Sequence, residues 1–156
     1  MFIYGKTATN GIAVMSYLAG VAPRRAGSEE IAMARRISRT LTAKLLTQLS
    51  GAGLVSGQPG PGGGYTLARD ADHIRLADIV ALFSHGGEAI PCPFGSGWCG
   101  VGDPCPLHET ISRLMETHRA FLQNTRLSVF QAGGGILPVL TLPQTLPRDP
   151  HALHNP

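Results

Sequence analysis

The sequence predicts a mainly α-helical fold with one β-hairpin and a long C-terminal helix. Three short segments within residues 7–50 space their apolar side chains as amphipathic helices do. Two short β-type runs separated by a glycine-rich stretch follow at residues 54–67. Beyond residue 106, apolar side chains recur at alternating steps of four and three, which is typical of a helix that packs along a narrow seam.

The composition indicates one folded domain with appended elements. The chain has 156 residues, of which 43% are hydrophobic and 15% charged, as in ordinary globular proteins. The first residues lack the basic-then-apolar plan of a signal peptide, and no apolar run approaches membrane-spanning length. We therefore expect a cytoplasmic protein without a membrane partner.

The first predicted helix covers residues 7–19, and Gly20 can end it. Ser28 is expected to cap a short second helix, in which Glu29 and Glu30 complement the helix dipole and which ends at Arg35-Arg36. Ser38 is expected to cap a third helix that runs to about Ser50. Its predicted buried stripe comprises Ile37, Leu41, Leu45, Leu46 and Leu49.

Two short helices joined by a tight turn form a helix-turn-helix. The runs 54–56 and 65–67 predict a hairpin directly after the second of these helices, which is the plan of a winged helix-turn-helix. Residues 1–70 carry a net charge of +5 and residues 71–156 a net charge of −2. A basic front half is typical of a domain with a polyanionic partner, although a solvated surface explains it almost as well.

The candidate DNA contacts lie on the third helix and on the wing. Ser38, Arg39, Thr40 and Lys44 are placed to reach bases or phosphates. The wing residues Gly62, Gly63, Gly64 and Tyr65 belong to a glycine-rich segment whose backbone can approach a phosphate or a narrow groove. The partner expected is double-stranded operator DNA.

An apolar helix is predicted over residues 74–83, and it leads into a loop that contains all three cysteines. Cys92, Cys99, Cys105 and His108 form a soft ligand set suited to an iron–sulfur cluster, zinc or copper. Clustered thiols in a cytoplasmic chain are more often metal ligands than disulfides. Cys105 is predicted as the N-cap of the next helix, with Pro106 at its first position and His108 one turn in.

The long helix carries a predicted seam, and a seam of this kind can join two copies of the chain. Its members are Leu107, Ile111, Leu114, His118 and Phe121, with Met115 and Leu122 beside them. Thr125 is expected to cap a last short helix to about Gln131. The predicted division is residues 1–83 for the winged domain, 84–106 for the cysteine loop, 107–131 for the dimerisation helix and the final helix, and 132–156 for a mobile Gly/Pro-rich tail.

With these features, residues 7–131 resemble the Rrf-type winged-helix transcriptional regulators, the group that includes IscR, NsrR and RirA. The resemblance is carried by residues 53–55, the run 60–65, the helix at 74–80 and the cysteine triplet. It implies a homodimer joined through the long helix, with an iron–sulfur cluster site in each subunit. It also implies a transcriptional regulator rather than an enzyme.

The ending Cys105-Pro106-Leu107-His108 is similar to the IscR type, which implies a 2Fe–2S cluster held by the three cysteines and His108. A 4Fe–4S cluster stays open. The expected function is regulation of transcription by a cluster that senses iron, redox or nitric oxide status. Two alternatives also stay open: a Cys3His zinc site, and a thiol redox switch without metal. Pro59 stands where the family's wing usually carries an arginine, and Ala43 stands where IscR-like proteins carry an acidic residue. The base preference of those proteins is therefore not assigned to this chain.

Overall fold

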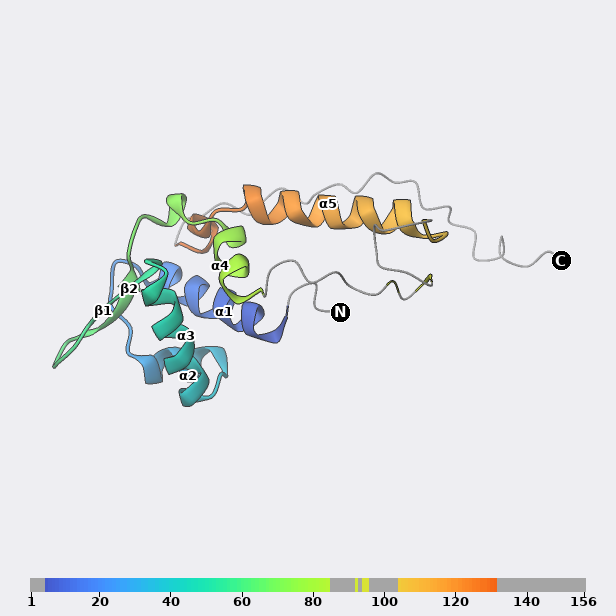
Figure 1. Ribbon diagram of the computed structural model, residues 1–156. Coiled ribbons are helices and arrows are strands. Elements are labelled where there is room, and N and C mark those ends of the chain that lie inside the picture. The colour runs from blue at the N-terminus through green and yellow to red at the C-terminus, as the bar shows by residue number, and fades with distance from the viewer. Residues whose placement is uncertain (1–4, 85–91, 93, 96–103, 132–156) are drawn as a thin grey trace.

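The computed structural model describes residues 5–84, 92, 94–95 and 104–131. Its elements are α1 (Lys6–Val21), α2 (Ser28–Arg35), α3 (Arg39–Gly51), β1 (Val55–Gln58), β2 (Gly64–Leu67), α4 (Leu76–Phe83) and α5 (His108–Asn124), with 3₁₀ turns η1 (Ala71–His73) and η2 (Leu127–Phe130). The described residues thus form a mainly helical fold with one two-stranded antiparallel sheet, as predicted (Figure 1). The tail predicted for residues 132–156 lies outside the described residues.

Helix α1 is the centre of the winged domain, because α2, α3, α4, β2 and η2 all contact it. Its fully buried side chains include Val14, Met15 and Leu18, which face the buried Leu45, Leu46 and Leu49 of α3 in one hydrophobic cluster. The predicted stripe of α3 is therefore confirmed at these three leucines, whereas Ile37 and Leu41 are only partly buried. Thr42, which the apolar pattern did not include, is also buried.

Helices α2 and α3 form the predicted helix-turn-helix. Ser38 caps α3 as expected, because its Oγ accepts a hydrogen bond from the amide of Leu41 at 3.3 Å. The N-cap of α2 is Gly27 rather than Ser28. The carbonyl of Gly27 accepts the first helical bond from Ile31, and its amide donates to the Glu30 carboxylate, so Ser28 becomes the first helical residue.

Strands β1 and β2 form the wing, which extends beyond the helices (Figure 1). Val55 pairs with Leu67 and Gln58 with Gly64, so the strands cover most of the predicted hairpin and the tip is residues 59–63. A second backbone pairing, between Ala26 and Tyr65, joins the wing to the segment between α1 and α2. The wing is thus attached to the same part of the domain that carries the helix-turn-helix.

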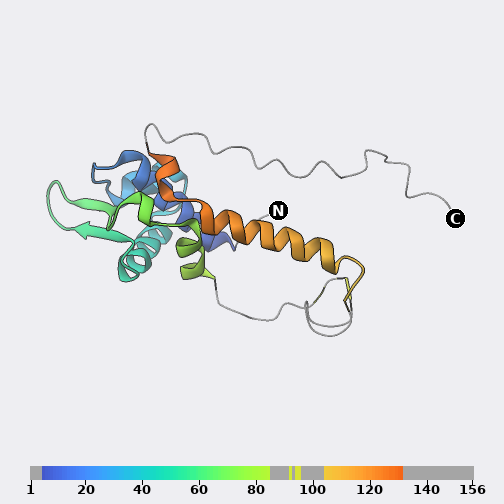
Figure 2. The same ribbon diagram turned by 90° about the horizontal axis from the view of Figure 1, so that it is seen from above.

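Helix α5 is attached to the winged domain at its C-terminal end. The amide of Leu76 donates to the carbonyl of Thr125 at 3.0 Å, and the amide of Leu127 donates to the carbonyl of Ile74 at 2.9 Å. Thr125 ends α5 in an extended conformation and does not cap a further helix; the predicted last helix is the 3₁₀ turn η2. From this attachment α5 extends away from the winged domain, so that the N-terminal end of α5 lies farthest from it (Figure 2).

The start of α5 also differs from the prediction. The N-cap is Leu107, and Cys105 and Pro106 precede the helix in a turn. The amide of His108 donates to the carbonyl of Cys105 at 2.9 Å, and the first helical bond runs from Ile111 to Leu107. His108 is consequently the first residue of the helix and lies beside the turn that contains Cys105. None of the helices in the described part of the chain is long and apolar enough to span a bilayer.

Candidate DNA-binding surface and cysteine site

The N-terminal end of α3 presents polar side chains to solvent. Ser38, Arg39 and Thr40 are exposed. The Ser38 hydroxyl oxygen accepts the amide of Leu41, which leaves its hydrogen available to an external acceptor. These predicted contacts thus lie at an exposed helix end, where polar groups can meet a ligand.

Arg39 is already engaged within the protein. Its guanidinium forms an ion pair with the carboxylate of Glu29 in the first turn of α2. Both side chains are more than half exposed, at 74% and 58%, so the pair is weak in water and a phosphate can compete for the guanidinium. Glu29, which the sequence reasoning assigned to the helix dipole, therefore also holds Arg39 in the free protein.

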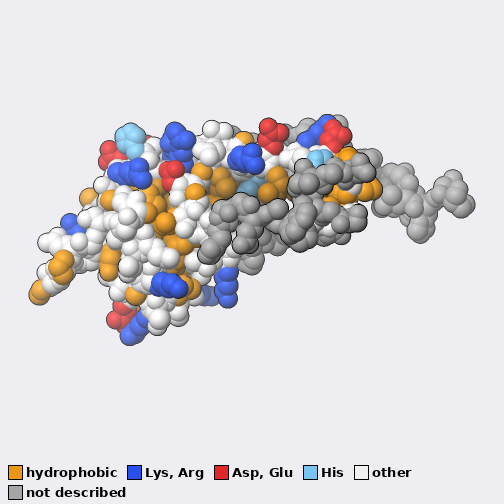
Figure 3. Space-filling model, viewed as in Figure 1, with side chains coloured by type: hydrophobic (Ala, Val, Ile, Leu, Met, Phe, Trp, Pro, Cys, Tyr) orange, Lys and Arg blue, Asp and Glu red, His pale blue; other side chains and the backbone are white. Residues whose placement is uncertain are grey.

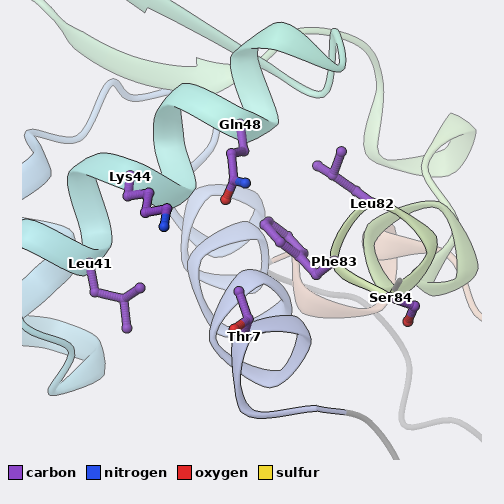
Figure 4. Close-up of a pocket in the computed structure, with 7 residues that line it drawn as sticks. All are labelled: Thr7, Leu41, Lys44, Gln48, Leu82, Phe83 and Ser84. Atoms are coloured by element: carbon purple, nitrogen blue, oxygen red, sulfur yellow. The ribbon is translucent and has the colours of Figure 1, made fainter. Parts of the chain in front are cut away.

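Lys44 lies one turn after Thr40, on the same side of α3. It lines a pocket of about 270 Å³ between α3, the start of α1 and the end of α4 (Figure 4). The other lining residues are Thr7, Leu41, Gln48, Leu82, Phe83 and Ser84. The side chain of Lys44 thus belongs to the junction between α3 and the end of α4, a location that the sequence did not reveal.

Two of the wing glycines, Gly63 and Gly64, are required by close backbone packing. A Cβ atom on Gly63 would lie 2.2 Å from the carbonyl oxygen of Gln58, and Gly64 has a φ of +134° with the carbonyl of Ala26 2.8 Å from a Cβ. Tyr65 is half-buried, and its ring lies beside Gly57. These residues shape the wing, and the exposed Gly62 lies in its tip.

A polar cluster around Glu30, which the sequence did not predict, fixes α2 against α1. The Glu30 carboxylate accepts hydrogen bonds from Tyr17 Oη at 2.7 Å, from both terminal nitrogens of Arg24 at 2.6 and 3.2 Å, and from the amide of Gly27. The hydrogen bonds from Arg24 and then Tyr17 lower the pKa of Glu30 to about 2, while the Glu30 carboxylate raises the pKa of the Tyr17 hydroxyl. No local pattern indicates this cluster, because its members come from α1, α2 and the connection between them.

The segment 24–44, which contains the helix-turn-helix, is basic: it carries Arg24, Arg25, Arg35, Arg36, Arg39 and Lys44 against Glu29 and Glu30. On the face shown in Figure 3, Lys and Arg side chains lie over α2 and α3 and also along the upper edge of the molecule, where acidic side chains lie among them. In this region Glu29 and Glu30 are each paired with an arginine, Arg39 and Arg24 respectively. The unpaired positive charge that remains favours an anionic partner.

Two of the predicted metal ligands converge at Gly95. A Cβ atom on this glycine would lie 3.2 Å from Cβ of Cys105 and 3.7 Å from Sγ of Cys92. The amide of Gly95 faces the carbonyl of Cys92 at 3.5 Å. Both cysteines are free thiols and partly buried. The absence of a side chain at position 95 thus lets two soft donors from opposite ends of the loop approach one another.

Of the two remaining predicted ligands, His108 lies within the described residues and Cys99 does not. His108 is partly buried and begins α5 next to the turn of Cys105. Cys99 lies outside the described residues, and within the described part of the chain no group of three or more His, Cys, Asp or Glu side chains could hold a metal ion. Cys92, Cys105 and His108 are all described, so the structure does not bring these three donors together at one metal position. By donor type alone, two thiols and an imidazole suit a soft metal or an iron–sulfur cluster.

The chain matches known regulators over most of its length. The model of the Rrf2 family, described as an iron-dependent transcriptional regulator, matches residues 4–132. An HTH-type transcriptional regulator of Aquifex aeolicus is 30% identical over 127 residues, which cover 80% of this chain and 88% of that protein. The regulator IscR of Klebsiella pneumoniae is 35% identical over 98 residues, which cover 63% of this chain and 60% of IscR.

Among solved structures, the oxidized form of CymR from Staphylococcus aureus has a TM-score of 0.63 and 25% identity, and the match covers 81% of this chain and 94% of CymR. The fold of the described residues is therefore the winged-helix fold of these regulators, and the family consists of transcriptional regulators rather than enzymes. The chain belongs to the Rrf2 family of transcriptional regulators.

Proposed function

We propose that this regulator binds operator DNA as a homodimer and that a metal centre in the loop from Cys92 to His108 sets its DNA affinity. The observation that supports the metal centre most directly is the convergence of Cys92 and Cys105 on Gly95. Two thiols that lie close together can act as soft metal ligands or as a redox pair.

In the proposed complex, α3 enters the major groove and the wing lies along the adjacent backbone. The exposed Ser38, Arg39 and Thr40 at the start of α3 are the candidate contacts, together with Lys44 and the wing segment from Gly62 to Tyr65. Arg39 would exchange its ion pair with Glu29 for a phosphate or a base edge. Each phosphate contact makes binding weaken more steeply with salt.

The proposed dimer interface is the apolar face of α5. Leu107, Leu114 and Met115 are 43%, 50% and 49% exposed although all three are large and hydrophobic. Ile111 and Phe121 lie on the same face and are partly buried. Among the described residues, α5 packs on the winged domain near Leu122, and a second copy of the helix would cover its exposed apolar side chains.

Cys92, Cys99, Cys105 and His108 are the proposed ligands, and the resemblance of the Cys105–His108 ending to the IscR type favours a 2Fe–2S cluster over a 4Fe–4S cluster. When bound, such a cluster supplies a centre that changes oxidation state or breaks down in response to redox conditions. The cysteines would bind as thiolates and His108 as a neutral imidazole. The backbone bond from His108 to Cys105 keeps these two ligands at the start of α5.

The position of the cysteine loop between α4 and α5 suggests how a change at the metal centre could alter the affinity for DNA. The loop follows α4 and precedes α5, and Ser84 at its start lines the pocket that also contains Lys44 of α3. A change in the loop would therefore act on the end of α4 and on the projecting helix, which together set the position of the recognition helices in a dimer.

A thiol switch is the second candidate, and the same convergence of Cys92 and Cys105 favours it. The likeness to CymR, solved in an oxidized form, is in line with this candidate. In such a switch the two thiols would form one disulfide, and the two electrons and two protons they lose would reduce hydrogen peroxide to two molecules of water. A zinc site with the same ligands is a third outcome that the ligand set allows.

The deciding experiment is metal and sulfide analysis of the full chain purified without oxygen, with its absorption spectrum and its binding to a duplex selected from random sequence. We expect iron and acid-labile sulfide in stoichiometric amounts, visible absorption, and a change in DNA affinity after the cluster is lost. Colourless protein with one zinc per chain would support the zinc site. Metal-free protein whose DNA binding responds reversibly to peroxide would support the thiol switch.

The ligand role of His108 has its own test. His108→Ala should alter the visible spectrum or shorten the lifetime of the cluster in air, because the fourth donor is lost. An identical spectrum and lifetime would show that another group completes the site.

A further inference from the structure

Arg36 has a backbone conformation that favours glycine. Among the residues that the structure describes, it is the single non-glycine residue with a positive φ, at φ 53° and ψ 41°. It follows the last residue of α2, where its amide donates to the carbonyl of Met33 and the amide of Ile37 donates to the carbonyl of Ala32 at 3.0 Å. This is the hydrogen-bond pattern of a Schellman cap, whose left-handed position is usually occupied by glycine.

The side chain of Arg36 is not needed to hold the fold together. It is exposed, and within the described residues it forms no hydrogen bond or ion pair. The neighbouring arginines differ in this respect. Arg24 is paired with Glu30, and the guanidinium of Arg35 lies 5.4 Å from the centre of the Tyr17 ring. Arg39 is paired with Glu29.

The position of Arg36 explains what its charge can do. It lies in the turn between α2 and α3, two residues before the Ser38 cap. In a helix-turn-helix complex the first helix crosses the DNA backbone and the start of the second helix enters the major groove. The turn between them is consequently close to the phosphates at the edge of the groove, and a free guanidinium is the side chain best suited to bind a phosphate with two parallel hydrogen bonds.

We propose that Arg36 is a DNA-backbone contact whose guanidinium binds a phosphate at the edge of the groove that α3 enters. The cost of placing an arginine in a left-handed conformation is then offset by this contact in the complex. The inference rests on the proposed placement of α3 in the major groove. It adds a contact that the polar face of α3 did not indicate, because Arg36 lies outside both helices.

The backbone conformation makes a clean test possible. Arg36→Gly removes the side chain and at the same time suits the left-handed conformation, so the variant should melt at the same temperature as the native chain or higher. Arg36→Lys keeps the charge. Arg119→Ala removes one exposed positive charge from α5, far from the helix-turn-helix in sequence, and is the matched control.

Binding of the full-length variants to a duplex that the native protein selects from a random pool would be measured at several salt concentrations. The dimer carries one Arg36 in each subunit, so Arg36→Gly removes two phosphate contacts and should reduce the slope of log affinity against log salt by about 1.8. The affinity deficit of Arg36→Gly should therefore be about 12-fold larger at roughly 50 mM than at roughly 200 mM salt. Arg36→Lys should recover most of the slope, and Arg119→Ala should keep the native slope.

Native affinity and native slope in Arg36→Gly would overturn the inference, and so would an equal loss of slope in Arg119→Ala. An Arg36→Lys variant that binds as weakly as Arg36→Gly would also overturn it, because a phosphate contact depends on charge. Failure of the native protein to select any duplex would instead count against the proposed mode of DNA binding, which separates the two outcomes.

Discussion

The ring of Phe83, the last residue of α4, packs directly against Gly11 in α1. A Cβ atom on Gly11 would lie 2.3 Å from Cε2 of Phe83, so no larger residue fits while the ring keeps its place. Phe83 also lines the pocket beneath Lys44 and immediately precedes Ser84, where the segment towards the cysteines begins. The contact therefore fixes the end of α4 against the centre of the winged domain.

Gly11→Ala should destabilise the chain because the added methyl group displaces the Phe83 ring. Overpacking of this kind costs about 1–3 kcal/mol, which exceeds the gain of about 1 kcal/mol from replacing glycine by alanine within a helix. Thermal unfolding followed by circular dichroism would measure the difference. Gly51→Ala is the control, because nothing lies within 4 Å of a Cβ at that position.

A double variant separates this contact from other effects of the glycine. If Phe83 is the residue that is displaced, Phe83→Leu should reduce the cost of Gly11→Ala, and the two changes should not be additive. Additive losses in the double variant would show that the methyl group is accommodated elsewhere.

Glu30→Gln should lower the melting temperature at neutral pH and have little effect near pH 2. The hydrogen bonds from Arg24 and Tyr17 lower the pKa of Glu30 from 4.5 to about 2. Since the folded pKa is lowered, the carboxylate stabilises the fold above about pH 5, and this contribution is lost as the pH falls towards 2. Melting temperatures of both proteins between pH 7 and pH 2 would show the two curves converging; a constant difference across this range would contradict the prediction.

Leu114→Asp should convert the proposed dimer into monomers without unfolding the winged domain. Leu114 is 50% exposed in the single chain, so the folded monomer tolerates a charge there, whereas a charge in a covered apolar face is costly. Light scattering coupled to size exclusion would give the mass of the particle. Ala120→Asp places the same charge on an exposed position outside the apolar face and should leave the mass unchanged. A Leu114→Asp chain that keeps the native dimer mass would place the interface elsewhere.

Gly95→Val should weaken the cysteine site, and Gly95→Ala should do so to a smaller degree. A Cβ at this position would be 3.2 Å from Cβ of Cys105 and 3.7 Å from Sγ of Cys92, so a larger side chain pushes the two thiols apart. We expect a loss of about tenfold in metal affinity for the valine variant, as for other residues that support ligands. Iron and sulfide content after dilution into a chelator would measure it. Equal retention in all three proteins would show that Gly95 does not bring the ligands together.

Local sequence patterns predicted most of the elements because the features that decide them are local. The Ser38 cap, the leucines at helical spacing in α3 and the glycine-rich turn of the wing each act within a few residues, and all three are present in the structure. The start of α5 was placed too early because the Cys105–Pro106 pair suits a helix N-terminus. The turn closed by His108 and Cys105 takes precedence there.

By itself, the sequence determined the helix-turn-helix, the wing, the apolar face of α5 and the gathering of the cysteines in one loop. Tertiary structure alone decided the relations between distant residues: the ion pair of Arg39 with Glu29, the ring of Phe83 against Gly11, and the convergence of Cys92 and Cys105 at Gly95. The physical reason is that hydrophobic spacing specifies which face of an element is buried. The partner of a charged or aromatic side chain depends on how the buried faces pack together.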